Sequence, residues 1–320
     1  MSDEETIGPE EGELTSDEND LAFTDLPLVP EVQEAIDAIG YETPSPIQAE
    51  AIPFLLEGRD LLGVADTGTG KTAAFALPIL TNLDPRGGGP QALCLTPTRE
   101  LAIQVAEAFE SFGNRIRGFQ ALPIYGGSDY GKQIRGLKNG APVVVGTPGR
   151  IMDHINKGTL KLDKIRTLVL DEADEMLSMG FIDDIEWILD HMPEERQTAL
   201  FSATMPPKME ALAKTMVRNP VRIAIKPEEP TVELIDQKLL YVEKKNKDAL
   251  LASILQDRTL KKALVFTQMK HVANKVVKKL HHAGIRGTAI HGNKSQAART
   301  KALADFKQGR VKVLVATDVA

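Results

Sequence analysis

The sequence predicts an α/β protein with two tandem domains, each built on a parallel sheet covered by helices. The first observation is a series of short apolar runs separated by longer amphipathic stretches, at residues 61–64, 93–95, 121–125, 143–145, 168–170, 198–201 and 221–225. The second is Pro227-Glu228-Glu229-Pro230, which breaks this series as an interdomain linker would. A second series follows, with runs at 239–242, 263–267, 288–290 and 313–316 and a helical stretch at 270–282. We therefore expect domains over 21–226 and 231–320, joined at 227–230.

Charge is distributed unevenly along the chain. Residues 1–20 carry nine acidic side chains and no Lys or Arg, so we expect a disordered acidic tail there. Residues 231–320 hold 18 basic and seven acidic side chains, although the whole chain has a net charge of −7. This basic excess favours a polyanionic partner such as a nucleic acid. A solvated helix face with Lys275, Lys278 and Lys279 would explain part of it.

The composition excludes several classes of protein. A chain of 320 residues that is 42% hydrophobic and 26% charged is typical of about two globular domains. Its one cysteine, Cys94, lies in an apolar run, so we expect a packed core thiol, no internal disulfide and a reducing cytosol. No apolar stretch approaches the roughly 18 residues that span a bilayer, so we expect no membrane role and a cytoplasmic location.

A Gly-rich turn follows the first apolar run. Such a turn brings successive backbone N–H groups close to a triphosphate, and the positive end of the following helix adds to the attraction. In this interpretation Lys71 lies against the β- and γ-phosphates, and the Thr72 hydroxyl ligates Mg²⁺. An ordinary turn is the alternative, because the general phosphate-loop pattern has Gly where this chain has Ala65. The turn comprises Ala65, Asp66, Thr67, Gly68, Thr69, Gly70, Lys71 and Thr72.

A carboxylate cluster, Asp171-Glu172-Ala173-Asp174, follows the apolar run at 168–170. Asp171 would emerge at the carboxyl end of a strand, where it can hold the metal ion. Glu172 beside it can orient or deprotonate an attacking water. An Asp-Glu pair after a strand is a weak signal alone. Together with the Gly-rich turn it predicts a nucleoside triphosphatase with Lys71, Asp171 and Glu172 as catalytic residues.

Further segments make the chain resemble the bacterial type of DEAD-box ATP-dependent RNA helicases over residues 23–320. They are the stretch 40–48, with Phe23 upstream, and Ser202-Ala203-Thr204 after the run at 198–201. The resemblance implies two RecA-like domains that use ATP and Mg²⁺ to separate short RNA duplexes. It implies that Asp174 and residues 202–204 couple hydrolysis to strand separation, although the latter could be an ordinary helix cap.

The same resemblance extends the ATP site. Gln48 offers both an acceptor and a donor to the adenine edge, although residues 43–48 could simply be a Pro-rich helix start. The implied ATP-binding residues outside the Gly-rich turn are Phe23, Tyr41, Gln48 and Asp318.

The predicted RNA site consists of residues that follow strands on the sheet edge where open α/β folds bind ligands. They offer hydroxyls, backbone N–H groups and two guanidiniums, which suit a sugar-phosphate backbone and do not read bases. In the second domain, Gln296, Arg299 and Thr317 match further family segments and are implied to face RNA. The residues in the first domain are Pro97, Thr98, Arg99, Gly126, Gly127, Thr147, Pro148, Gly149 and Arg150.

The chain departs from the family pattern in two places. Asp66 stands where the family often has Gln, Glu or Arg. The chain ends at Ala320, inside the fifth conserved segment and before the family's arginine fingers, so we expect a fragment with an incomplete second domain. An ATP- and RNA-binding module with little turnover is therefore one alternative. A DNA helicase or translocase is another, which Gln48 and residues 171–174 disfavour.

Overall fold

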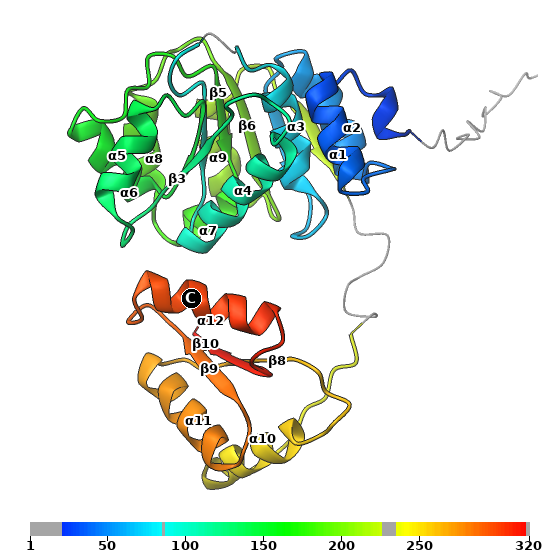
Figure 1. Cartoon of the computed structure of the whole chain (residues 1–320), viewed down its shortest axis with the longest axis vertical. Helices are drawn as coiled ribbons and strands as arrows, with labels where there is room; N and C mark the ends of the chain where they lie inside the picture. The colour runs from blue at the N-terminus through cyan, green and yellow to red at the C-terminus, as the bar shows by residue number, and fades with distance from the viewer. Residues whose placement is uncertain (1–20, 85–86, 226–234, 318–320) are drawn as a thin grey trace, which may run out of the picture.

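The computed structural model describes residues 21–84, 87–225 and 235–317, which form two α/β units (Figure 1). The predicted acidic tail at 1–20, the linker at 227–230 and Asp318 lie outside the described residues. Both sheets are parallel and carry helices on their faces, so the predicted fold class is confirmed.

The first unit contains a seven-stranded sheet in the order β3-β4-β2-β5-β6-β1-β7. Every predicted apolar run of this unit forms a strand, and all neighbouring strands pair in parallel. The bounds are β1 Leu61–Val64, β2 Ala92–Leu95, β3 Ala121–Ile124, β4 Val143–Gly146, β5 Thr167–Leu170, β6 Gln197–Ser202 and β7 Val221–Ala224.

Helices cover both faces of this sheet and enclose two hydrophobic clusters. Successive side chains of a strand point to opposite faces, so Val169 of β5 belongs to one cluster and Leu168 to the other. The helices are η1 Phe23–Asp25, α1 Pro30–Ala38, α2 Pro46–Leu56, α3 Lys71–Thr81, α4 Arg99–Phe112, α5 Tyr130–Lys138, α6 Pro148–Asn156, α7 Ala173–Ser178, α8 Ile182–Leu189 and α9 Pro207–Met216.

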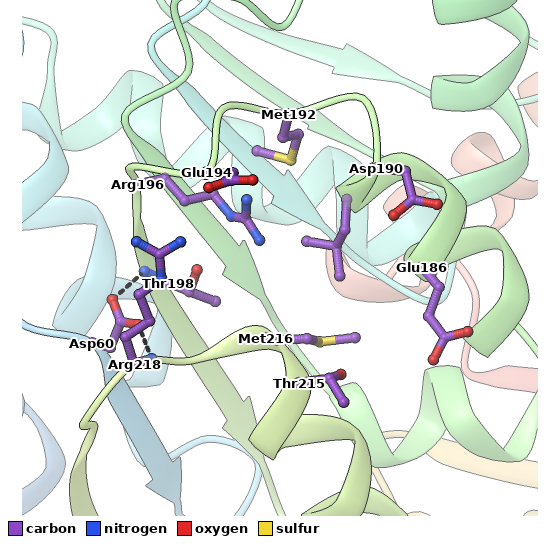
Figure 2. Close-up of a pocket in the computed structure, with 11 residues that line it drawn as sticks. Asp60, Glu186, Asp190, Met192, Glu194, Arg196, Thr198, Thr215, Met216 and Arg218 are labelled. Atoms are coloured by element: carbon purple, nitrogen blue, oxygen red, sulfur yellow. Dashed lines mark hydrogen bonds between the residues drawn. The ribbon is translucent and has the colours of Figure 1, made fainter.

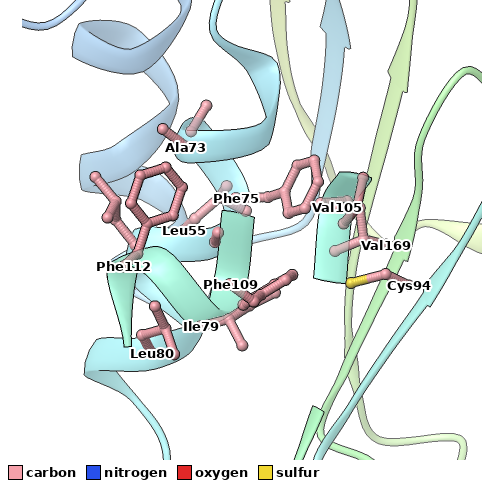
Figure 3. Close-up of a cluster of buried hydrophobic side chains, with 14 of the residues drawn as sticks. Leu55, Ala73, Phe75, Ile79, Leu80, Cys94, Val105, Phe109, Phe112 and Val169 are labelled. Carbon is pink, nitrogen blue, oxygen red and sulfur yellow. The ribbon is translucent and has the colours of Figure 1, made fainter. Parts of the chain in front are cut away.

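Aromatic side chains fill the cluster between the sheet and helices α2, α3 and α4 (Figure 3). The ring centroid of Phe75 lies 6.1 Å from that of Phe109 and 5.4 Å from that of Phe201. Cys94 is fully buried in the same cluster, as predicted for a core thiol. Burial raises the pKa of this thiol well above its ordinary value, and the charge of Asp171 adds to the effect.

The second unit contains a three-stranded parallel sheet in the order β8-β10-β9. The predicted helix at 270–282 is confirmed as α11. The strands are β8 Ala263–Phe266, β9 Gly287–Ile290 and β10 Val313–Ala316, and the helices are η2 Lys244–Asn246, α10 Lys247–Leu255, α11 Lys270–His282 and α12 Gln296–Lys307.

The strand predicted at 239–242 is wrong. These residues form no regular element, and the exposed fractions of Leu239 and Tyr241 are 76% and 92%. Strand preference is mainly the preference of a side chain for a paired, half-buried surface. No strand within the described ranges pairs with this run, so it has no ladder to join.

The carboxyl edge of the seven-stranded sheet gathers the predicted motifs. Because the strands are parallel, the turns that follow them emerge at one edge. The Gly-rich turn follows β1. The segments 97–99, 126–127 and 147–150 follow β2, β3 and β4, in that order. The segment 171–174 follows β5, and the segment 202–204 begins at the last residue of β6.

Candidate nucleotide and nucleic-acid site

The Gly-rich turn forms a tight loop between β1 and the start of α3. Gly70, the residue before α3, has a φ of 95°, which only glycine adopts readily. A Cβ atom at this position would also lie 2.3 Å from Gln48 Nε2, so a larger residue would have to displace the Gln48 amide. Lys71 is buried, and its Nζ donates a hydrogen bond of 2.7 Å to the Ala65 carbonyl. The ammonium group is therefore held inside the loop, where a phosphate would lie.

The first turn of α2 braces this loop from the other side. Gln48 Nε2 donates to the Gly70 carbonyl at 3.1 Å, and Ser45 Oγ donates to the Thr69 carbonyl at 2.7 Å. Gln48 Oε1 also accepts a hydrogen bond from the Ser45 N–H at 2.8 Å, which caps the helix. Both ends of the Gln48 amide are thus engaged with the protein. Its reading of adenine stays a prediction, and it would require these hydrogen bonds to be exchanged.

Asp171 lies at the end of β5 with 2% of its surface exposed. Burial and the neighbouring charge of Glu172, opposed by Lys71, together raise the pKa of its carboxyl to about 7. Its Oδ1 atom has no hydrogen-bond partner in the part of the chain that the structure describes. A buried, unpaired carboxylate oxygen is a suitable ligand for a hard cation, so the site fits Mg²⁺.

The other ligands of a Mg²⁺ ion at Asp171 would be groups other than carboxylates. The described residues contain no group of three or more His, Cys, Asp or Glu side chains that could hold a metal. Mg²⁺ typically takes one or two protein ligands and completes its shell with phosphate oxygens and waters. The Thr72 hydroxyl, in the first turn of α3, is half-buried and follows Lys71 directly.

Glu172 has a strained backbone. Its φ of 54° and ψ of 51° lie in the left-handed region, which costs a residue other than glycine about 1–3 kcal/mol. Burial raises the pKa of its half-buried carboxyl, Lys71 opposes the shift, and Asp174 and Glu175 add to it. Strain of this kind often marks a functional site. A carboxylate with a raised pKa is also a better proton acceptor.

Asp174 connects the end of β5 to the end of β6. Its Oδ2 atom accepts hydrogen bonds from the Thr204 N–H at 2.9 Å and from Thr204 Oγ1 at 2.8 Å. Although burial acts to raise its pKa, hydrogen bonds from Thr204 and Ser202 hold it below the ordinary value. Ser202 Oγ donates to the Thr204 carbonyl at 2.6 Å, and Ala203 is half-buried between them. The structure thus brings the predicted coupling residues together.

A cleft of about 390 Å³ collects most of the residues predicted to bind RNA. Arg99 lies over the loop after β3, because a Cβ atom at Gly127 would come within 2.7 Å of Arg99 Nη1. Gly127 itself, with a φ of 81°, is exposed beside the cleft. The predicted residues in the lining are Pro97, Thr98, Arg99, Gly126, Thr147, Gly149, Arg150 and Arg299.

Two predicted RNA-binding residues of the second unit contact the first unit, and one of them, Arg299, also lines the cleft. Both lie on α12, which faces the first unit (Figure 1). Gln296 Nε2 donates to Glu100 Oε1 at 2.9 Å, and Arg299 Nη2 donates to Glu100 Oε2 at 2.8 Å. Both side chains are buried by this contact. No role was predicted for Glu100 from the sequence, although its place next to Arg99 could have suggested one.

Several predicted residues lie outside these contacts. Thr317 follows β10 and is 6% exposed, and it does not line the cleft. Phe23 is buried, with its ring centroid 5.5 Å from that of the half-buried Tyr41. Pro148 is buried in the first turn of α6. The predicted loop residues Asp66, Thr67 and Gly68 are exposed to solvent.

A second cavity, of about 660 Å³, lies near the amino ends of β1 and β6 (Figure 2). None of the predicted site residues lines it. The Asp60 carboxylate in its wall accepts hydrogen bonds from the backbone N–H groups of Thr198 and Arg218, at 2.7 and 2.6 Å. Asp60 therefore ties the starts of β6 and β7 to β1, which is a structural role.

The fold and the Gly-rich loop define the class of protein. A Gly-rich loop after β1, a carboxylate pair after β5 and a second parallel α/β unit across a cleft are typical of two-domain, RecA-like nucleoside triphosphate-binding proteins. A family model for DEAD/DEAH box helicases matches residues 45–212, and one for the helicase conserved C-terminal domain matches residues 246–320. The chain belongs to the DEAD/DEAH box helicase family.

Curated relatives agree with this assignment. The chain is 46% identical over 303 residues to ATP-dependent RNA helicase DeaD of Escherichia coli, which covers 95% of this chain and 48% of the relative. It is 48% identical over 298 residues to DEAD-box ATP-dependent RNA helicase CshA of Geobacillus kaustophilus, which covers 93% of this chain and 64% of the relative. The chain thus spans about half to two thirds of the length of these relatives.

Solved structures agree as well. S. cerevisiae Dbp5 bound to RNA and ADP BeF3 superposes with a TM-score of 0.82 at 34% identity, over 93% of this chain and 76% of that one. A DEAD box protein from the hyperthermophile Methanococcus jannaschii has a TM-score of 0.62 at 40% identity. The match covers 93% of this chain and 80% of that protein's chain. Among the described residues, no helix combines the length and apolar character needed to cross a membrane.

Proposed function

We propose that this chain binds ATP and RNA and, as a DEAD-box RNA helicase, couples ATP hydrolysis to the local separation of RNA duplexes. The observation that carries the proposal is the carboxyl edge of the seven-stranded sheet. There the loop with Lys71, the pair Asp171 and Glu172, and the cleft beside Arg99 emerge from neighbouring strands. The relatives named above are ATP-dependent RNA helicases, and Dbp5 binds RNA and ADP BeF3.

In the proposed ATP site, the backbone N–H groups of residues 66–70 and the Lys71 ammonium hold the β- and γ-phosphates. Asp171 and the Thr72 hydroxyl would hold Mg²⁺, which neutralises charge on the phosphates when it is bound. Glu172 orients the attacking water and accepts its proton, for which its raised pKa suits it. Phe23, Tyr41 and Gln48 would lie toward the adenine. We also assign Asp318 to this site from the family pattern.

In the proposed RNA site, the cleft binds one strand through its sugar-phosphate backbone. Arg99 and Arg150 supply positive charge, and the turns after β2, β3 and β4 supply N–H groups and hydroxyls. Asp174 and Thr204 connect the carboxylate segment to the end of β6, so a change at the phosphates can reach the rest of the sheet. We place the domains at 21–226 and 231–320 and the protein in the cytoplasm.

A steady-state ATPase assay of the purified chain tests this proposal. We expect Mg²⁺-dependent hydrolysis that rises on addition of single-stranded RNA and rises less with DNA of the same sequence, because 2′-hydroxyl contacts distinguish the two. Equal stimulation by DNA would indicate a DNA helicase or translocase. ATP and RNA binding without turnover would indicate the binding module.

A further inference from the structure

We propose that His154 is a positioning residue for RNA binding, which acts through Gln133 and Tyr130 to fix the loop at Gly126 and the guanidinium of Arg150 relative to each other. His154 lies on α6, behind the cleft, and does not line it. The inference rests on the RNA site proposed above.

A chain of hydrogen bonds connects α6 to the loop after β3. His154 is fully buried, and its Nε2 atom lies 2.9 Å from Gln133 Oε1 on α5. Gln133, also buried, donates through Nε2 to the Tyr125 carbonyl at 3.0 Å. That carbonyl belongs to the peptide bond that leads into Gly126. The other ring nitrogen, Nδ1, lies 2.8 Å from Thr159 Oγ1.

We call the chain from His154 through Gln133 to the Tyr125 carbonyl the relay. The carbonyl at its end determines which atom donates in each of its hydrogen bonds. A carbonyl only accepts, so Gln133 presents Nε2 to Tyr125 and its Oε1 atom to the histidine. His154 Nε2 must therefore carry a proton. The Thr159 hydroxyl lies 3.0 Å from the His154 carbonyl and 2.8 Å from Nδ1, and the carbonyl also accepts from the N–H groups of Thr159 and Leu160. With Nε2 protonated and the ring neutral, Nδ1 is an acceptor, so the single hydroxyl proton is donated to Nδ1. The histidine is neutral in this arrangement, and burial, aided by the charge of Arg150, lowers its pKa to about 4.

The same imidazole supports Arg150 through an aromatic ring. The Tyr130 ring stacks on His154 with a centroid distance of 4.3 Å and an interplanar angle of 3°. The Arg150 Cζ atom lies 4.9 Å and the Lys157 Nζ atom 4.4 Å from the centroid of the Tyr130 ring. Asp153 pairs with both cations, at 3.5 and 2.9 Å. Arg150 therefore depends on a ring whose own position is set by His154.

This relay joins two segments that must bind one RNA strand together. The loop after β3 and the start of α6 both border the proposed RNA cleft, but they come from separate strands. A backbone-binding site gains affinity when its donors are already placed at the phosphate spacing, because less ordering remains to be done on binding. A buried hydrogen-bonded chain, in which both ring nitrogens of His154 and both ends of the Gln133 amide are paired, provides this rigidity.

Gln133→Leu and Tyr130→Leu test the two branches of the relay, with RNA and nucleotide affinity measured on the full chain. Gln133→Leu removes the connection to the loop and keeps a side chain of similar size. We expect it to raise the Kd for single-stranded RNA by about five- to twentyfold. The Kd for a fluorescent ATP analogue should change by less than about twofold, because the phosphate loop lies on other strands.

Gln91→Leu is the matched control. Gln91 is also buried, and its amide also bonds at both ends, to the N–H and carbonyl of Asp84, but it lies away from the cleft. It should lower the Tm comparably and leave the Kd for RNA unchanged. If both variants change RNA affinity equally, the effect is one of general stability and the relay is wrong.

A double-mutant cycle tests the second branch and does not depend on Gln133→Leu folding. If Tyr130 acts through Arg150, then Tyr130→Leu should weaken RNA binding in the wild-type background and have little further effect in Arg150→Ala. Additive effects would overturn this branch.

Arg99→Ala distinguishes a failure of the relay from a failure of the proposed RNA site. If it weakens RNA binding while Gln133→Leu and Tyr130→Leu do not, the relay alone is wrong. If it has no effect, the proposed RNA site is wrong and the relay falls with it.

Discussion

The two α/β units bury their sheets to different extents. In the first unit, β2, β4 and β6 are almost wholly buried between two layers of helices. In the second, the central strand β10 is buried, but the edge strand β8 alternates between half-buried and exposed residues, and Leu264 and Phe266 are 55% and 67% exposed. The polar groups proposed for chemistry emerge from the strands that are buried on both faces. A rigid, double-sided core can hold a strained residue such as Glu172 and a buried carboxylate such as Asp171, because packing over-determines their positions.

The largest effect should come from the phosphate loop, which tests whether the chemistry resides in the first unit. Lys71→Ala removes the cation inside the loop, and we expect it to abolish detectable ATP binding in a fluorescent-nucleotide titration. Glu172→Gln keeps the shape of the side chain but cannot accept a proton, so ATP should bind while hydrolysis falls by roughly 10²-fold or more. Wild-type affinity in Lys71→Ala, or loss of binding in Glu172→Gln, would contradict these roles.

Replacing one phenylalanine in each unit measures how much each ring contributes to stability. Phe75→Ala in the first unit removes a fully buried ring, which should cost about 3–5 kcal/mol of unfolding free energy. Phe266→Ala on the exposed face of β8 should cost within about 0.5 kcal/mol, as surface substitutions usually do. Urea unfolding followed by Trp187 fluorescence reports on the first unit, and hydrogen exchange of β8 and β10 reports on the second. Equal costs would mean that the second sheet is packed as well as the first.

The buried histidine of the first unit should make stability depend on pH. The folded-state pKa of His154 is lowered from 6.5 to about 4, so the unfolded state binds more protons between these values. This contribution to stability is therefore fully present above about pH 6.5 and is lost as the pH falls towards 4, by up to about 3 kcal/mol. His154→Gln should flatten the difference in Tm between pH 7 and pH 5. An unchanged slope would show that His154 is not held neutral.

A more local effect is expected at the contact between the units. Glu100→Gln removes the charge that pairs with Arg299 and should weaken the contact by about 1–3 kcal/mol. Single-molecule energy transfer between a label on α4 and one on α11 should then show a larger population of separated units. Glu34→Gln is the control, since Glu34 is an exposed residue of α1, which lies away from α12 (Figure 1). An identical distribution in both variants would mean that Glu100 does not hold the units together.

Local patterns predicted the strands of the first unit because each is a short apolar run bounded by polar residues. This signal depends only on burial of the strand itself. It failed at residues 239–242, where the run is apolar but has no partner strand in the described structure. Whether an apolar run becomes a strand is decided by its neighbours, which a single run does not specify.

The candidate site also has features that the local sequence predicts and features that it does not. The sequence alone indicated the phosphate loop, the pair Asp171 and Glu172, and the family, because these depend on residues adjacent along the chain. Only the tertiary structure showed that Gln48 is engaged at both ends, that Glu100 holds Gln296 and Arg299, and that His154 connects α5 to α6. Hydrogen bonds of this second kind join residues up to 199 positions apart. Their partners are chosen by the packing of whole elements, so no local spacing in the sequence specifies them.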